Sequence, residues 1–239
     1  MIKLENTEVV GWEHAIRGMR NPKNSHDRMD SYECMNMDCD SCYYWEGDED
    51  SWGCKHNENS TYIIGPNDHK LMMSLAKGGP VHAKYRRMIA VYVDITAPLY
   101  WWKEFDTYKV GTVANSCSTM HKIHDKEFTF EDFSVEKLFM TEIQPMHGAT
   151  TPHLFAMVID ALNFWRDQYN ETKEKLYWEQ MIQLLPSSYN QKRTIMLNYE
   201  VLVGIYRDRK NHKLDEWRTL CDWIESLPYS EIITGEKET

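Results

Sequence analysis

Alternating apolar positions predict strands in the first half of the chain. Residues 87–96 place Ile and Val side chains at every second position, and Ala97-Pro98 ends this run. Because β-branched residues at a period of two are typical of a half-buried strand, we expect a strand here. Residues 7–20 have the pattern of a short strand followed by a helical turn.

Apolar residues at helical spacing occupy most of the remaining chain. Leu71, Met72 and Leu75 share one helical face, and Gly78-Gly79-Pro80 ends that helix. The C-terminal third repeats such spacing from Leu154 onwards. The pattern predicts an α+β protein with a few strands and several long helices, over residues 67–80, 99–109, 154–165, 170–186, 194–208 and 212–226.

Two polar stretches interrupt these patterns. Residues 21–60 are acidic and rich in Asp, Asn, Ser and Cys, and residues 31–60 are interpreted as a cysteine-rich inserted module. Residues 110–122 are small and polar, including Asn115 and Cys117. Such a composition is more typical of a loop that lines a site than of a core segment.

Composition narrows the class of protein. A chain of 239 residues with 42% hydrophobic residues can form one sizeable domain with an ample core. Its net charge of −10 repels nucleic acid at long range, which excludes general nucleic-acid binding but not a small basic pocket. No apolar run approaches the roughly 20 residues of a membrane span, and the first six residues lack a signal pattern. We therefore expect a cytoplasmic protein without a membrane segment.

Four of the six cysteines lie close together and suggest a metal. Cys34, Cys39, Cys42 and Cys54 have the soft ligands and one Cys-x-x-Cys knuckle that structural zinc uses. A metal would also stabilise an acidic segment that cannot form a core. The spacing also suits an iron–sulfur cluster, and free thiols or disulfides remain alternatives. The module could present a surface to a protein partner.

Two segments resemble one enzyme family. In the first, the strand ends with Ile95-Thr96-Ala97-Pro98, and residues 107–120 align with the signature Arg-His-Arg-x-x-Ser-x-Asn-Glu-x-Ser-x-Arg-Tyr. In the second, Leu185-Pro186 precedes Asn198-Tyr199-Glu200-Val201-Leu202, followed by Arg209 and Arg218. This pattern resembles the flavin-dependent thymidylate synthases (ThyX). The resemblance implies a single domain over residues 1–239, with a small antiparallel sheet packed with several long helices, and a homotetramer that binds FAD.

The signature is heavily rewritten. Thr107-Tyr108-Lys109 replaces Arg-His-Arg, and Thr119 and Met120 replace Arg-Tyr. Charge-assisted bonds from Arg to phosphate are worth about 1.5–3 kcal/mol each, so these losses weaken the binding of the usual ligands. The resemblance places catalytic residues at Cys117 and Asn115. It places the nucleotide-binding residues at Lys109, Thr112, Ser118, Lys192, Arg193, Asn198, Arg209 and Arg218.

Two functional hypotheses follow. In the first, the chain binds a pyrimidine nucleotide similar to dUMP, and one-carbon or reductive chemistry modifies the base. A thiolate at Cys117 near a cation could attack the pyrimidine ring, although a structural thiol is the alternative interpretation. In the second, the chain is a catalytically inactive ThyX relative. It would bind a nucleotide or a protein as an accessory factor in phage counter-defence, in a bacterial or phage-infected cell. The sequence leaves open whether the chain is an enzyme.

Overall fold

The computed structural model describes residues 2–34, 62–138 and 150–235. The chain divides into two units, and each is described by itself below. The first unit comprises Met1–Lys3, Ile95–Thr107 and Asn115–Arg193. The second unit comprises Leu4–Asp94, Tyr108–Ala114 and Thr194–Thr239.

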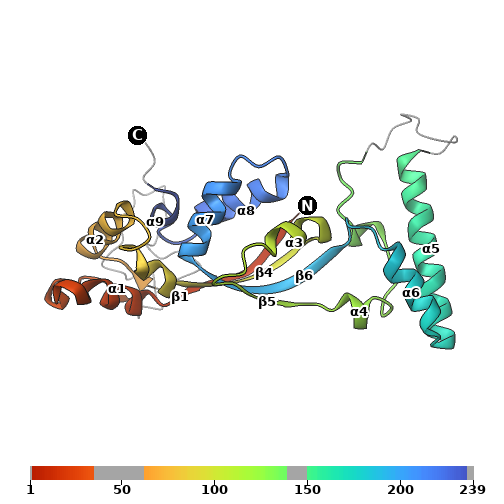
Figure 1. Ribbon diagram of the computed structural model, residues 1–239, viewed down its shortest axis with the longest axis horizontal. Helices are drawn as coiled ribbons and strands as arrows, with labels where there is room; N and C mark the ends of the chain where they lie inside the picture. The colour runs from red at the N-terminus through yellow and green to blue at the C-terminus, as the bar shows by residue number, and fades with distance from the viewer. Residues whose placement is uncertain (1, 35–61, 139–149, 236–239) are drawn as a thin grey trace, which may run out of the picture. The chain divides into compact units, whose positions relative to one another are not determined.

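Strands form a four-stranded sheet and a two-stranded one (Figure 1). The strand order of the larger sheet is β1 (Lys3–Val10), β4 (Ala90–Pro98), β6 (Asn190–Asn198) and β5 (Val113–Ser116). The smaller sheet pairs β2 (Tyr32–Glu33) antiparallel with β3 (Tyr62–Ile63).

The apolar alternation of β4 explains its place in the larger sheet. Val91, Val93 and Ile95 are buried, whereas Tyr92 between them is exposed. Side chains that alternate between two faces bury one apolar face of the strand. A strand is therefore present where residues 87–96 predicted one, but it runs over Ala90–Pro98, and residues 87 and 88 belong to the short helix Lys84–Met88.

The described residues of the second unit contain the helices α1 (Trp12–Arg20), α2 (Pro66–Lys77), α7 (Tyr199–Arg209), α8 (Asp215–Ser226) and α9 (Glu231–Thr234). Helix α7 packs against α8 and α9. Its buried residue Tyr199 meets Trp12 edge to face, with ring centroids 5.3 Å apart. Large aromatic side chains thus form the centre of this core.

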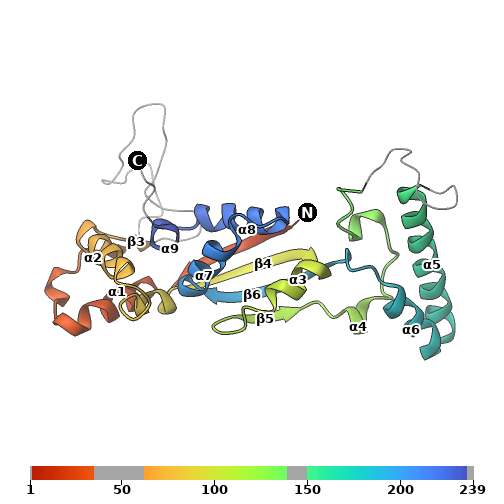
Figure 2. The same ribbon diagram turned by 45° about the horizontal axis from the view of Figure 1, so that its top comes forward.

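The first unit contains α3 (Leu99–Phe105), α4 (Thr119–Lys122), α5 (Thr151–Thr172) and α6 (Lys175–Leu184). Helices α5 and α6 run side by side, as both views show (Figures 1 and 2). The core of this unit is an apolar cluster of Ile123, Phe128, Phe133, Ile159, Leu162 and Met181. On α3, Trp101 and Trp102 are buried with ring centroids 4.9 Å apart.

The predicted α+β class, with a small sheet and several long helices, is confirmed. The helix predicted over 194–208 is wrong in its first part, because residues 194–198 belong to β6 and the helix begins at Tyr199. Residues 110–122, interpreted as a loop, include β5 and α4. Most of the cysteine-rich module at 31–60 lies outside the described residues, and the single-domain prediction stays a prediction. None of the described helices is long and apolar enough to cross a membrane.

Candidate functional site

A cavity of about 560 Å³ lies beside Cys117 in the first unit. Its wall includes the turn between β5 and α4, where Cys117 is exposed, and the start of β6. Three of the predicted site residues line this cavity, namely Cys117, Ser118 and Lys192. A volume of this size lies within the range of small-molecule sites, about 300–1,000 Å³.

Hydrogen bonds to β6 fix the position of Cys117. Its backbone N–H donates to the carbonyl oxygen of Lys192 at 2.9 Å. Its own carbonyl oxygen accepts a hydrogen bond from Nε2 of Gln191, also at 2.9 Å. Ser118 then begins α4, because its Oγ accepts the backbone N–H of His121 at 3.2 Å. The thiol is thus held in the cavity wall by a rigid backbone.

Charged groups of both signs surround the thiol. Nζ of Lys122 lies 2.8 Å from Oδ2 of Asp125, and Lys126 pairs with Asp132. The hydrogen bond and charge of Asp125 raise the pKa of Lys122, with a smaller contribution from Cys117. Burial raises the pKa of Tyr189, and Asp132 and Cys117 add to the effect. The Cys117 sulfur therefore lies within electrostatic range of an ammonium and a phenol.

Arg193, a predicted nucleotide-binding residue, is held by three groups of its own unit. Its NH1 lies 2.7 Å from Oδ1 of Asp106, and its Nε donates to Oε1 of Gln191 at 3.0 Å. Its guanidinium also lies 4.2 Å from the ring centroid of Trp102. Neither Arg193 nor Asn115 lines the Cys117 cavity, and Asn115 is an exposed residue of β5.

The remaining predicted residues belong to the second unit, where Arg209 is enclosed by aromatic rings. Its Nε donates to the hydroxyl of Tyr108 at 2.9 Å. Its guanidinium lies 4.5 Å from the ring centroid of Trp217. Cation–π contacts of this kind stabilise a guanidinium without removing its charge. Arg209 therefore packs against the signature segment through Tyr108.

Arg218 and Asn198 have local structural roles. Arg218 pairs with Asp215 one helical turn away, and its NH1 donates to the carbonyl oxygen of His212 at 2.8 Å. Asn198 begins α7, because its Oδ1 accepts the backbone N–H of Val201 at 3.1 Å. Their predicted role in nucleotide binding stays a prediction.

Lys109 and Thr112 offer polar groups that the described structure does not satisfy. Lys109 is exposed and forms no ion pair with any described residue. The Thr112 hydroxyl is buried, and within the described parts of the chain it has no hydrogen-bond partner. Buried polar groups without a partner are rare, so the Thr112 hydroxyl is available to donate to a bound group.

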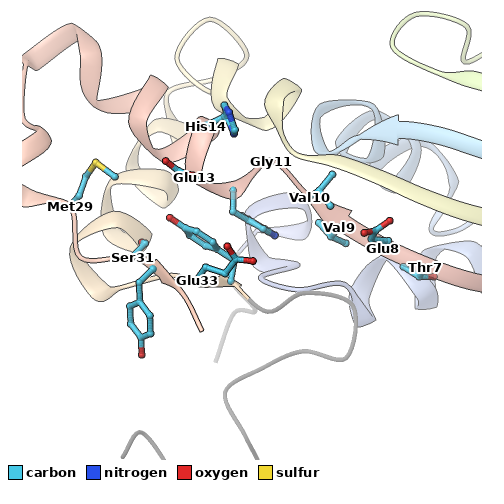
Figure 3. Close-up of a pocket in the computed structure, with 13 residues that line it drawn as sticks. Thr7, Glu8, Val9, Val10, Gly11, Glu13, His14, Met29, Ser31 and Glu33 are labelled. Carbon is cyan, nitrogen blue, oxygen red and sulfur yellow. The ribbon is translucent and has the colours of Figure 1, made fainter. Parts of the chain in front are cut away.

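A second pocket, of about 710 Å³, was not predicted from the sequence (Figure 3). It lies in the second unit where β1 meets α1, and Glu8, Glu13 and Glu33 line it. Burial raises the pKa of Tyr62 in its wall to about 12, together with the charges of Glu13, Asp68 and Glu33. A pocket of this charge repels phosphate. Glu8, Glu13 and Glu33 form no motif in the sequence, so this pocket could not be predicted from it.

The predicted metal site cannot be placed on the structure. Cys39, Cys42 and Cys54 lie outside the described residues, and Cys34 is a free, partly buried cysteine next to them. Within residues 2–34, 62–138 and 150–235, no three His, Cys, Asp or Glu side chains form a group that could hold a metal ion. The zinc assignment stays a prediction from spacing alone.

Solved structures with a similar fold are known. A crystal structure of ThyX from Helicobacter pylori, described with FAD and dUMP, has a TM-score of 0.59 at 15% identity, over 97% of this chain and 96% of that one. A second ThyX structure from that organism, complexed with FAD and dUMP, has a TM-score of 0.56 at 12% identity, over 97% of this chain and 95% of that one. The UMP/dUMP methylase PolB from Streptomyces cacaoi, bound with 5-Br dUMP, has a TM-score of 0.52 at 13% identity, over 98% of this chain and 94% of that one.

These similarities concern the fold. No protein-family model matches the sequence, and a search of the curated proteins finds no match. At identities of 12–15%, the comparisons show a shared fold over nearly the whole chain. Sites and activities are shared only where named residues of this chain support them.

Proposed function

We propose that this chain, which has the ThyX fold, binds a pyrimidine nucleotide of the dUMP type and takes part in modifying its base. Two observations point the same way. The similar structures are described with dUMP or 5-Br dUMP. The end of the signature-aligned segment of this chain, at Cys117, Ser118 and Thr119, forms part of the wall of a cavity of suitable size.

The exposed thiol of Cys117 carries this proposal. It is fixed by two hydrogen bonds to β6 and is exposed at a cavity that could receive a base. A thiolate is a strong nucleophile, and addition to C6 of a pyrimidine would activate C5 for substitution. Cys117 would therefore be the catalytic residue, and the ammonium of Lys122 lines the same cavity.

Other cavity residues would bind and orient the nucleotide. The Ser118 hydroxyl accepts the N–H of His121 and keeps its own proton for a ligand oxygen. Lys192 would supply positive charge at the same wall. The three lysines of the cavity lie among carboxylates, so the cavity would bind a phosphate more weakly than an arginine cluster does.

FAD is proposed as the cofactor from the fold, since both ThyX structures are described with it. Two of the residues present fit an anionic, hydrogen-bonding group. The unpartnered Thr112 hydroxyl would donate to it, and Lys109 would supply a positive charge. When bound, a flavin supplies reducing equivalents for the transfer of a hydride. The homotetramer and the structural zinc of the cysteine module remain proposals from resemblance and spacing.

Protection of Cys117 from alkylation tests the proposal. The purified chain would be treated with iodoacetamide with and without dUMP, and each cysteine quantified by peptide mass spectrometry. We expect dUMP to slow alkylation of Cys117 and to leave Cys221 unaffected, because Cys221 is buried in the other unit. Native mass spectrometry of the same sample would detect bound flavin.

A matched variant separates binding from chemistry. Cys117→Ser keeps the size of the side chain and removes the thiolate, so dUMP should still bind while base modification stops. Loss of modification with retained binding would support a nucleophilic role. If dUMP neither binds nor protects Cys117, the nucleotide proposal is wrong. Binding without turnover by the flavin-loaded protein would favour an inactive, nucleotide-binding relative.

A further inference from the structure

A basic pocket of about 800 Å³ lies in the second unit and shares no lining residue with the Cys117 cavity. Its wall comes from the loop after α1, which contains the short helices Asn21–Lys23 and His26–Arg28, and from α2. Four cations line it, of which Arg20 is buried and the other three, Lys23, Arg28 and Lys70, are exposed. This concentration is unusual in a chain whose net charge is −10.

The three exposed cations of this pocket are not neutralised by described residues. Lys23, Arg28 and Lys70 are exposed, and none of them forms an ion pair with a residue that the structure describes. Asp27 is the single carboxylate among the lining residues. The three cations therefore leave a formal excess of positive charge at one concave surface, which attracts anions.

The base of the pocket is rigid. Arg20 beneath the loop is buried and donates through Nε to Asp68 at 2.6 Å. Its NH1 also donates to the carbonyl oxygen of Ser25 at 3.2 Å, which anchors the loop between Lys23 and Arg28. Because the charge of Arg20 is neutralised by Asp68, Arg20 holds the loop in place but does not itself attract an anion. Because the loop is already anchored, binding an anion in the pocket would order few additional backbone atoms and so cost little conformational entropy.

The N-terminus of α2 does not provide the anion site. The backbone N–H groups of Asn67 and Asp68 already donate to the carboxylate of Asp30, at 2.8 and 3.0 Å. An anion would instead meet side chains, including the hydroxyl of Ser74 and the ammonium of Lys70 on the same helix. The recognition chemistry is therefore that of cationic and hydroxyl donors around a phosphate.

We propose that this pocket binds the phosphate or diphosphate group of a small molecule. A nucleic-acid backbone is a poor ligand, because three cations in a chain of charge −10 cannot form a long electrostatic footprint. The volume of about 800 Å³ exceeds that of a single phosphate, so a phosphate ester can place its organic part beside the anion. The proposal is independent of the nucleotide site beside Cys117.

Calorimetric titration of the full chain with inorganic diphosphate tests this site. We expect saturable binding in the millimolar range or tighter that weakens as NaCl is added, since exposed charges are screened. Lys70→Gln and Arg28→Gln should each raise the Kd about fivefold, and the double variant more. The matched control is Lys77→Gln, which removes the same charge from the same helix outside the pocket. It should change the Kd less than twofold.

Two further titrations show whether the ligand is a phosphate ester or a free anion, and whether diphosphate binds here or at the Cys117 cavity. If ADP binds more tightly than diphosphate and loses affinity in Lys70→Gln, the ligand is a phosphate ester. Equal affinities indicate a free anion. Lys192→Gln, which removes a cation from the first site, should bind diphosphate like the unsubstituted chain. The proposal is overturned if diphosphate does not bind saturably, or if Lys70→Gln and Lys77→Gln bind it equally well.

Discussion

Arg20 and Asp68 form an ion pair inside the second unit, with Nε of Arg20 2.6 Å from Oδ1 of Asp68. Their side chains are only 4% and 0% exposed. Asp68 also accepts hydrogen bonds from the Ser31 hydroxyl and from the backbone N–H of Asp30, at 2.7 and 3.0 Å. The pair therefore ties α1 and α2 to the loop between them.

We expect Asp68→Ala to lower the free energy of unfolding by about 3–5 kcal/mol, because it leaves the buried charge of Arg20 unpaired. Asp27→Ala removes an exposed carboxylate from the same loop and should change it by less than about 0.5 kcal/mol. Urea unfolding followed by tryptophan fluorescence measures both. Similar losses in the two variants would contradict this account of the ion pair.

The same carboxylate predicts a pH dependence. Burial raises the pKa of Asp68, but the hydrogen bonds from Ser31, Asp30 and Arg20 outweigh it, so the pKa lies below its ordinary value of 3.8. A carboxyl whose pKa is lower in the folded state stabilises the fold above its unfolded pKa. That contribution is lost as the pH falls through the lowered folded value.

The stability gap between the unsubstituted chain and Asp68→Asn should therefore be constant from neutral pH down to about pH 5. It should shrink as the pH falls below about 4. Urea unfolding of both proteins at a series of pH values gives this curve. A gap that grows on acidification would have the wrong sign for a lowered pKa.

Arg193 should contribute to the stability of the first unit whether or not it binds a ligand. It lies over Trp102 at 4.2 Å and pairs with Asp106, which is 49% exposed, so solvent screens the ion pair. We expect Arg193→Gln to destabilise the unit by about 1–2 kcal/mol, mainly through the lost cation–π contact. Lys103→Gln, on exposed α3 surface, is the control and should be nearly neutral. A neutral Arg193→Gln would show that the contact does not stabilise the fold.

Cys117 and Cys221 should differ strongly in reactivity. Burial raises the pKa of Cys221 to about 11, and the charges of Asp222 and Glu225 contribute. Cys117 is exposed, so its thiolate can be reached by a reagent. At neutral pH we expect iodoacetamide to label Cys117 at least tenfold faster than Cys221 by peptide mass spectrometry, roughly the effect of access and pKa together. Equal rates would mean that Cys221 is transiently exposed.

A side chain at Gly111 should destabilise the fold. Its φ of +78° is unfavourable for other residues, and an added Cβ would lie 3.0 Å from Nδ2 of Asn198. We expect Gly111→Ala to cost about 1–2 kcal/mol of stability. Gly204→Ala is the opposite case, because this helical glycine has open space around it. That variant should stabilise the chain by about 0.5–1 kcal/mol, as measured by urea unfolding. Equal effects would contradict the backbone argument.

The elements with strong periodicity were predictable from the sequence, and those without it were not. Strand β4 carries its own apolar alternation, so residues 87–96 indicated it. Strand β5 has four exposed residues and no apolar face, so its pairing depends on its neighbours in the sheet. In β6, the buried positions Ile195 and Leu197 run directly into a helix that Asn198 begins. Because no turn residues separate β6 from α7, the boundary between the strand and the helix could not be located from the sequence.

The candidate site was predictable in part. Cys117, Ser118 and Lys192 were all selected from the sequence, and the structure brings them to one cavity. The bond between Gln191 and Cys117 joins residues 74 positions apart, and only the fold reveals it. The basic pocket beside Arg20 has no motif, because its cations come from a loop and a helix that meet through the Asp68 hydrogen bonds.

The short pairing of β2 with β3 has a consequence for how the chain can change. Tyr32 faces Ile63 and Glu33 faces Tyr62, so both ends of the intervening segment are held at neighbouring positions. The pairing therefore fixes the separation of the two points at which the chain leaves and re-enters the described part of the second unit. Any change of sequence that keeps Glu33 paired with Tyr62 leaves that separation as it is.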